Sequence, residues 1–461
     1  MNNEPASPFD ERRVTRLFLL AVLLHGLVYL CAVAPWMGED EPWHYEYASQ
    51  IADGQRPQLI GANALGALVD EPQHWAASQI YARWRFHGAS YEQLAARQRE
   101  ILASMSANDY FRRVDWAGAP TVRTDFDQVQ PLFTATLQPP GYYALLGAWL
   151  AAWPGASVDS ELLWGRVLSL VLYVFTAWCG LEFARRMFTD RSLALATAVA
   201  IAWYPMHARQ AAVLNNDVLA RVLTAAVLML CARRCAGVGR KYEFGLALAL
   251  ALFAPFVKPT AASAIGVLIV AWLARSNLRR VLVPALGGAA AFAAAVWFLL
   301  RNSPVMPKSV AAFAKRIGAG LSLDTFEEMG TTFVGAFNWY SRELPSWAYA
   351  LAALLGAVAF VSALVALRRR RAGVSQVLLV VCFAALAIQF VLVVFRGVGH
   401  GRYLMPALPA IAALFVVGLL APLPAKHRPR AAALFIAAFV AFDALFLWGG
   451  LVPNEWLAWG S

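Results

Sequence analysis

Apolar runs long enough to cross a lipid bilayer recur along this 461-residue chain. A spanning helix needs about 20 predominantly apolar residues. Eleven runs qualify, near residues 16–37, 163–184, 190–206, 218–233, 243–257, 259–274, 281–300, 347–367, 374–395, 404–421 and 431–451. Hydrophobic residues make up 60% of the chain and charged residues 15%, whereas soluble domains carry about 45–50% and about 25%. The pattern predicts an all-α polytopic membrane protein with about eleven transmembrane helices.

Basic residues gather in six short clusters between these runs and account for about half of the 39 Lys and Arg. With eleven spans, all six clusters fall on one side, which the positive-inside rule assigns to the cytoplasm. The formal charge of +11 is then explained by membrane topology. Nucleic-acid binding is disfavoured because no basic stripe is interleaved with aromatic residues. We expect a bacterial inner-membrane protein with a cytoplasmic N-terminus and an extracytoplasmic C-terminus.

Two longer polar stretches divide the chain, and both are predicted to be extracytoplasmic. The expected organisation is an N-terminus with a first uncleaved span (1–37), a first outer loop with interfacial helices (38–141), an interfacial helix with the membrane core (142–300), a second outer loop (301–346) and the C-terminal spans (347–461). Residues 142–153 are apolar but too short to span, so we expect them to form an interfacial helix. Asp40-Glu41-Pro42-Trp43-His44 has an echo in Asp70-Glu71-Pro72-Gln73-His74, whose role the sequence leaves open.

Polar and ionisable residues gather at the predicted outer ends of the spans. They are Asp40, Glu41, His44, Gln138, His207, Arg209, Asn215, Asn216, Asp217, Lys258, His400 and Arg402. Charges near a membrane interior are costly and usually face a cavity. A carboxylate can accept a proton as general base, while Lys and Arg hold phosphate. This combination suits group transfer from a phospholipid carrier, with the departing phosphate stabilised electrostatically.

Each of these residues also has a purely structural interpretation. Asp40 can cap a helix that begins with Glu41 and Pro42, and residues 215–217 can cap the following span. Lys258 can extend its ammonium to the membrane surface, and Arg402 with Tyr403 can anchor an interface. The common face of all these residues favours a site. His44 has too few companions at ligand spacing for a metal site. The five cysteines lie outside the long outer loop, so we interpret them as structural.

Four segments resemble a known family. Asp40-Glu41-Pro42-Trp43-His44-Tyr45 is similar to the first-loop signature of GT-C membrane glycosyltransferases, especially of a bacterial branch catalogued as a domain of unknown function. Gln138-Pro139-Pro140-Gly141-Tyr142-Tyr143 resembles the Pro-Pro-x-x-Tyr helix start of lipid-linked aminoarabinose and mannosyl transferases. Residues 333–347 resemble that branch's second outer loop. His400-Gly401-Arg402-Tyr403-Leu404, followed by Pro406 and Pro409, is similar to its late Gly-Arg-Tyr-Leu-x-Pro motif.

The resemblance implies a GT-C-type bundle with extracytoplasmic juxtamembrane helices and an inverting sugar transfer from a polyprenyl phosphate. The acceptor would be a glycan, lipid or protein of the cell envelope. Asp40 matches the catalytic aspartate and Glu41 is its neighbour. Candidates for binding the substrate and its phosphate are His44, Gln138, Tyr142, Asn216, Asp217, Lys258, His400, Arg402 and Tyr403.

Two alternatives to the enzyme remain at this point. One is a lipid or glycolipid transporter or flippase, and the other is a non-catalytic envelope-assembly protein. The sequence gives no reason to require a metal or another cofactor, and it leaves a divalent ion near Asp40 open.

Overall fold

The computed structural model describes residues 8–38, 40–54, 96–108, 138–153, 157–275, 318–337, 342–370, 373–396 and 399–453. The expected span at 281–300 and the echo at residues 70–74 lie outside these ranges, and so do most of the first expected outer loop and part of the second.

Helices form nearly all of the described chain. The α-helices are α1 (Pro8–Ala32), α2 (Glu41–Ala52), α5 (Ala96–Ala107), α7 (Gly141–Ala151), α8 (Val158–Met187), α9 (Arg191–Ala202), α10 (Pro205–Ala211), α11 (Asn216–Cys235), α12 (Lys241–Phe253), α13 (Ser263–Arg275), α16 (Leu323–Val334), α17 (Ser346–Arg368), α18 (Gln376–Arg396), α19 (Leu408–Leu419) and α20 (Arg428–Leu445). Shorter helical turns are η5 (Ala254–Phe256), η6 (Pro259–Ala262), η8 (Gly401–Ala407), η9 (Ala425–His427) and η10 (Phe446–Leu451).

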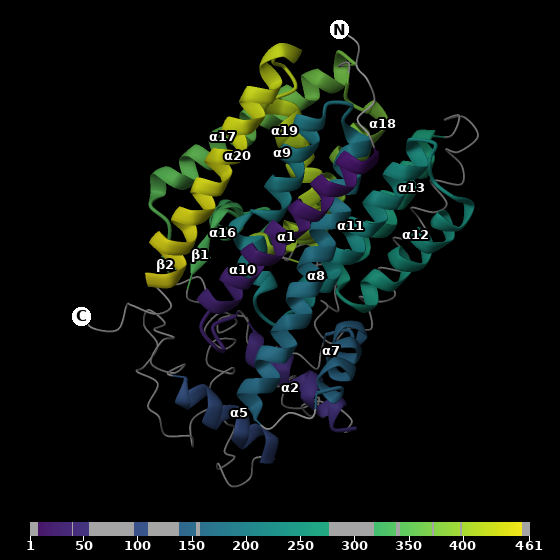
Figure 1. Ribbon diagram of the computed structural model, residues 1–461. Coiled ribbons are helices and arrows are strands. Elements are labelled where there is room, and N and C mark those ends of the chain that lie inside the picture. The colour runs from purple at the N-terminus through teal and green to yellow at the C-terminus, as the bar shows by residue number, and fades with distance from the viewer. Residues whose placement is uncertain are drawn as a thin grey trace.

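The long helices form one bundle, with α2, α5 and α7 gathered beyond one end of it (Figure 1). The only strands in the described ranges are β1 (Ala336–Phe337) and β2 (Arg342–Glu343), which pair antiparallel with Ala336 opposite Glu343. The described part therefore fits an all-α membrane protein with one short hairpin.

Six described helical segments are long and apolar enough to cross a membrane. They are Glu11–Ala32, Val158–Met187, Ser346–Arg368, Gln376–Phe395, Gly401–Leu419 and Ala425–Leu451. Shorter apolar helices cover Arg191–Ala202, Tyr242–Phe256 and Pro259–Ala274. The total of about eleven spans stays a prediction.

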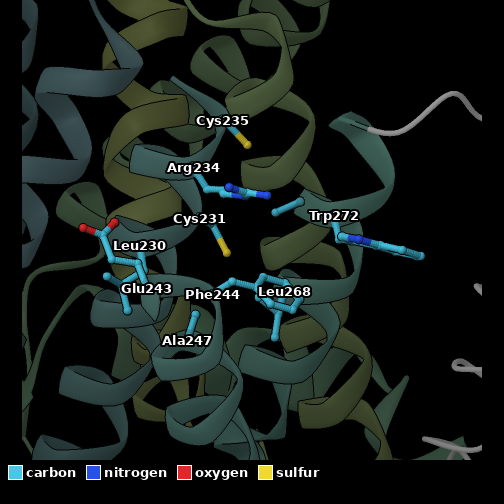
Figure 2. A pocket seen from close by; sticks show the side chains of 10 residues that line it. Leu230, Cys231, Arg234, Cys235, Glu243, Phe244, Ala247, Leu268 and Trp272 are labelled. Atoms are coloured by element: carbon cyan, nitrogen blue, oxygen red, sulfur yellow. The ribbon is translucent and has the colours of Figure 1, made fainter. Parts of the chain in front are cut away.

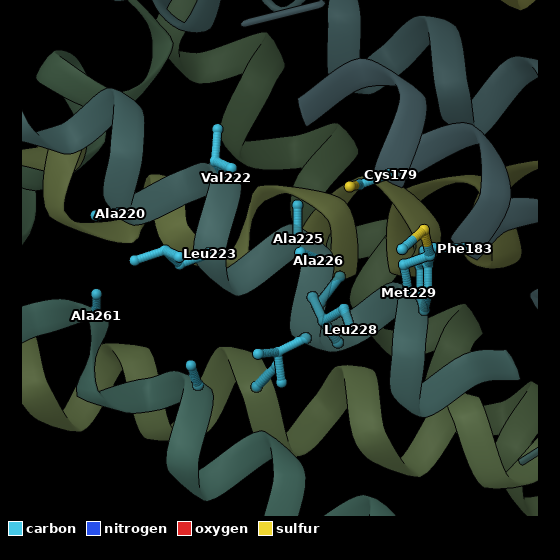
Figure 3. Close-up of a cluster of buried hydrophobic side chains, with 14 of the residues drawn as sticks. Cys179, Phe183, Ala220, Val222, Leu223, Ala225, Ala226, Leu228, Met229 and Ala261 are labelled. Atoms are coloured by element: carbon cyan, nitrogen blue, oxygen red, sulfur yellow. The ribbon is translucent and has the colours of Figure 1, made fainter. Parts of the chain in front are cut away.

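Helix α11 occupies the centre of the bundle and is buried continuously from Asn216 to Ala232. It packs against α8, α12 and α13. Small side chains such as Ala220, Ala225 and Ala226 line its contacts (Figure 3), and such residues let helix backbones approach closely in membranes. Because neighbouring helices surround α11, its charged residues are shielded from lipid. The helix can therefore carry polar groups into the bundle.

Helix α7 is the short apolar helix that the sequence predicts at residues 142–153. It packs against α2, and a tryptophan pair fastens it to α8. The indole N–H groups of Trp149 and Trp164 each donate to the other residue's carbonyl oxygen, at 2.8 and 3.0 Å. Its location at the membrane interface remains a prediction.

Candidate functional site

The first part of the candidate site is the turn between α1 and α2. Asp40 precedes α2 with φ 61° and ψ 9°, in the left-handed region, and its side chain makes no capping hydrogen bond to the helix. Its carbonyl oxygen accepts from the backbone N–H groups of Trp43 and His44 at 3.1 and 3.0 Å. A non-glycine residue in this region costs roughly 1–3 kcal/mol, and such residues cluster at functional sites. The backbone of Asp40 thus starts the helix while its carboxylate points elsewhere.

The Asp40 carboxylate meets an arginine that follows it by 362 residues. Its Oδ2 lies 2.8 Å from Nη2 of Arg402, which donates to it. Arg402 is on η8, and its guanidinium carbon lies 5.3 Å from the ring centroid of Tyr403. Arg402 and Tyr403 are both buried. Both side chains pack inside the protein, and the alternative that they anchor a membrane interface stays untested.

Lys258 reaches the same tyrosine from another part of the chain. It lies between η5 and η6, and its Nζ is 4.9 Å from the Tyr403 ring centroid. The same Nζ is 2.5 Å from Oδ1 of Asp217 on α11, with side-chain exposures of 3% and 2%. Lys258 therefore does not extend to the membrane surface. Tyr403 contacts both cations, so the two predicted phosphate ligands share one aromatic ring.

The start of α11 combines a cap with site residues. The Asn215 side chain accepts a hydrogen bond from the Val218 N–H at 3.2 Å, so the cap interpretation is correct for Asn215. The Asn216 amide donates to Oε1 of Gln138 and to the carbonyl of Val257, both at 3.4 Å. These long bonds connect the turn before α7 with the turn that carries Lys258. Asn216 thus lies beside Gln138 and beside the turn that carries Lys258, and that the two bind substrate stays a prediction.

Glu41 and Asp40 contact different groups. Its carboxylate accepts from Arg166 Nε and Nη2 at 2.9 and 2.7 Å, and from the N–H groups of Leu214 and Gly38 at 3.0 and 3.3 Å. Arg166 on α8 also donates to the carbonyls of Val33 and Ala34. These contacts show that Glu41 stabilises the turn between α1 and α2. That it is catalytic stays a prediction.

Sequence reasoning missed Arg166. It was detectable as the one basic residue inside the apolar run 163–184. Ionisable residues inside spans mark sites or their supports.

His44 lies among stacked aromatic rings next to the turn. Its Nδ1 is 2.8 Å from Oη of Tyr143, and Tyr143 stacks on Tyr47 with centroids 4.0 Å apart. Tyr142 is fully buried and meets the His44 ring edge-on. The pKa of His44 is lowered to about 4, mainly by burial; the charge of Asp40 opposes this shift, and the charges of Lys258 and Arg402 add to it. His44 is therefore neutral at pH 7.

His400 precedes Arg402 by two residues and contacts α16, a helix within the predicted second outer loop. Its Nδ1 is 2.9 Å from Oε1 of Glu328 on α16. Burial lowers the pKa of His400, while Glu328 raises it. Helix α16 packs against the start of η8, where the Gly401 N–H donates to Thr332 Oγ1 at 2.6 Å. His400 thus connects the arginine segment with α16.

A third cation, Arg221, lies beside Asp217 on α11. Its Nε donates to the backbone carbonyl of Asp217 at 3.1 Å, and its Nη1 lies 2.7 Å from Nδ1 of His207. The charges of Arg221, Lys258 and Arg402 all act on the Asp217 carboxylate. Sequence reasoning missed Arg221, although it interrupts the apolar run 218–233 near its start.

Within the described ranges, no group of three or more His, Cys, Asp or Glu side chains is arranged to hold a metal ion. A cavity of about 310 Å³ lies near the other end of α11 and another of about 220 Å³ lies beside α18, and neither is lined by Asp40, Lys258 or Arg402. The lipid-accessible hollow expected beside Asp40 therefore stays a prediction.

Comparison with known proteins gives a family but no activity. No curated protein matches the chain. The profile of one family matches residues 23–411, a stretch that contains both Asp40 and Arg402. With most of its length matched, the chain belongs to the family described as "Predicted membrane protein (DUF2142)".

Proposed function

We propose that this protein is an inverting glycosyltransferase that moves a sugar from a polyprenyl-phosphate carrier to a cell-envelope acceptor. The proposal places the reaction at the periplasmic face of the bacterial inner membrane. The observation that carries it is that Arg402 pairs with Asp40 and shares the Tyr403 ring with Lys258, although the three charged residues come from remote parts of the chain. The motif resemblance of the same residues to GT-C enzymes supports it.

In the proposed reaction, Asp40 is the general base. An acceptor hydroxyl attacks the anomeric carbon of the donor while its proton passes to the Asp40 carboxylate. A carbon–oxygen bond to the acceptor forms as the carbon–oxygen bond to the phosphate breaks. The polyprenyl phosphate leaves with the bonding electrons, and attack from the face opposite the leaving group inverts the sugar configuration.

The cations would bind the donor phosphate and stabilise it as it leaves. A lipid phosphodiester carries one negative charge, which the Arg402 guanidinium and the Lys258 ammonium would attract. A guanidinium has five N–H donors, so Arg402 can contact a phosphate while Nη2 still donates to Asp40. That contact would also hold the base beside the leaving group.

The sharpest test compares Asp40→Asn with Asp53→Asn. Asp53 stands at the far end of the same helix, where it is 40% exposed and 3.8 Å from Arg97. Both variants should insert and purify like the wild type. In nanodiscs loaded with polyprenyl-phosphate sugars, with water as the acceptor hydroxyl, release of polyprenyl phosphate and free sugar, followed by mass spectrometry, should be lost only in Asp40→Asn. Equal turnover by Asp40→Asn and wild type would remove Asp40 from the mechanism.

Donor binding can be measured separately from turnover. Polyprenyl phosphate should raise the melting temperature of the wild type in detergent, and it should raise that of Arg402→Gln much less. Unchanged stabilisation of Arg402→Gln would contradict the phosphate role. The contact between Asp40 and Arg402 also counts against a scaffold protein, for which these side chains would point apart or into lipid.

A transporter is the second candidate, and a polar cluster within the spans favours it. His25 Nε2 of α1 lies 2.8 Å from Oδ2 of Asp443 on α20, and Tyr29 donates to Oδ1 of the same carboxylate at 2.7 Å. Paired ionisable residues within spans are common in transport pathways. Lipid-linked sugar crossing proteoliposome membranes in the wild type, but not in Asp443→Asn, would favour this function.

A further inference from the structure

A cavity of about 310 Å³ opens between α11, α12 and α13, away from the candidate site. Its walls are mostly apolar and include Phe244, Leu268 and Trp272. Figure 2 shows the side chains of Arg234 and Cys235 on one side of the space, and Phe244 and Leu268 on another. Trp272 is 46% exposed and Phe244 38%, so the cavity has a rim on the outer surface of the bundle.

The cavity and the candidate site lie at opposite ends of one helix. Asp217 stands in the first turn of α11 and Arg234 in its last turn. At about 1.5 Å per residue, these positions are separated by roughly 26 Å. A bilayer hydrocarbon core is about 30 Å thick. If the candidate site is at one membrane surface, Arg234 is at the head-group level of the opposite leaflet.

The charges around the cavity favour an anion. Glu243 is a lining residue, but its carboxylate is held by Arg233, whose Nε and Nη2 donate to it at 2.9–3.2 Å. This ion pair is neutral as a unit. Arg234 adds a positive charge at the cavity, and Arg240 lies just beyond the helix end in the same basic cluster. A tryptophan at the rim is typical of the membrane–water interface.

We infer that this cavity binds an anionic phospholipid of the leaflet opposite the candidate site. The lipid phosphate would contact the Arg234 guanidinium, and part of an acyl chain would pack against Phe244, Leu268 and Trp272. Basic pockets between transmembrane helices bind lipid head groups of this kind. The cavity is at the small end of the range for ligand sites, so it takes part of a lipid. This inference is independent of the proposed glycosyl transfer.

The test measures the binding of phosphatidylglycerol to the purified full-length protein by native mass spectrometry. Phosphatidylcholine with the same acyl chains is the neutral comparison. We expect phosphatidylglycerol to bind more tightly, and Arg234→Gln to weaken that binding about fivefold. Arg240→Gln is the matched control, because Arg240 belongs to the same basic cluster and does not line the cavity. It should change binding less than twofold.

Three outcomes would overturn the inference. They are equal binding of both lipids, an unchanged affinity in Arg234→Gln, and an equal loss in both arginine variants. The first indicates a cavity filled by any acyl chain, and the last indicates general surface charge.

A cysteine readout locates the lipid within the protein. Cys235 lines the cavity and is partly exposed, whereas Cys31 is exposed on α1. Phosphatidylglycerol should slow alkylation of Cys235 by a small haloalkyl reagent, measured by peptide mass spectrometry, and leave that of Cys31 unchanged. Equal rates at Cys235 with and without phosphatidylglycerol would show that the lipid binds elsewhere. This measurement needs no substitution, so it holds even if a variant misfolds.

Discussion

Asp40 and Glu41, which are adjacent in the chain, should separate activity from stability, and Glu41→Gln tests this most directly. The Glu41 side chain is fully buried and Arg166 is 4% exposed. Glutamine keeps the shape and one carbonyl acceptor but removes the negative charge. The Arg166 guanidinium would then be buried with the carbonyls of Val33 and Ala34 as its neutral acceptors.

The expected cost follows from that uncompensated charge. Removing one partner of a buried ion pair typically destabilises a protein by about 3–5 kcal/mol. The double variant Glu41→Gln/Arg166→Met removes the positive charge as well, and the introduced glutamine still offers an oxygen to the Leu214 N–H. Since replacing a buried pair by neutral groups is often close to neutral, the double variant should be more stable than Glu41→Gln alone.

Unfolding in mixed micelles of a mild detergent and dodecyl sulfate, followed by tryptophan fluorescence, measures these free energies. Asp40→Asn is the comparison, because the Asp40 side chain is 21% exposed whereas that of Glu41 is fully buried, so the loss of the Asp40 charge should destabilise the protein less. A free energy of unfolding for Glu41→Gln within about 1 kcal/mol of wild type would refute the reasoning. So would a double variant less stable than Glu41→Gln.

Three further substitutions and a pH titration test other contacts. The folded-state pKa of His44 is about 4, against 6.5 for the free side chain. Because the unfolded chain takes up the proton first, the free energy of unfolding should fall by roughly 3 kcal/mol as pH falls from about 6.5 to about 4. In unfolding measured across this pH range, His44→Gln should show a weaker pH dependence than the wild type. Lys258→Met should weaken stabilisation by polyprenyl phosphate in a thermal-shift assay, and unchanged affinity would exclude a phosphate contact. A Cβ on Gly401 would lie 2.2 Å from the Phe333 nitrogen, so Gly401→Ala should lower both the melting temperature and the rate of polyprenyl-phosphate release. Gly330→Ala, where a Cβ meets open space, should leave both quantities near wild type.

The sequence predicted where helices form better than it predicted which charges pair. Apolar length alone located the long helices, because each hydrophobic run has to cross lipid as a helix. The cluster of polar residues at one end followed from the same topology. The pairs of Glu41 with Arg166 and of Lys258 with Asp217 depend on the rotation and depth of packed helices. Periodicity in a nearly uniform apolar run does not specify that rotation.

The only sequence signal for burial of α11 was Arg221, which interrupts the run at residues 218–233. Residues 215–217 at its start were interpreted as either caps or ligands. The structure divides these roles, since Asn215 caps the helix and Asp217 pairs with Lys258. Asp40 shows the opposite case, because its neighbours favoured a cap and its side chain makes none.

The contact between residues 40 and 402 has a consequence for biosynthesis. At about 5–20 residues per second, the ribosome adds the intervening 362 residues in roughly 20–70 s. Throughout that time Asp40 has no Arg402 to pair with, and the turn in the left-handed region has to wait for one of the last segments to be synthesised. A nascent chain that stalls before residue 402 would therefore lack this contact.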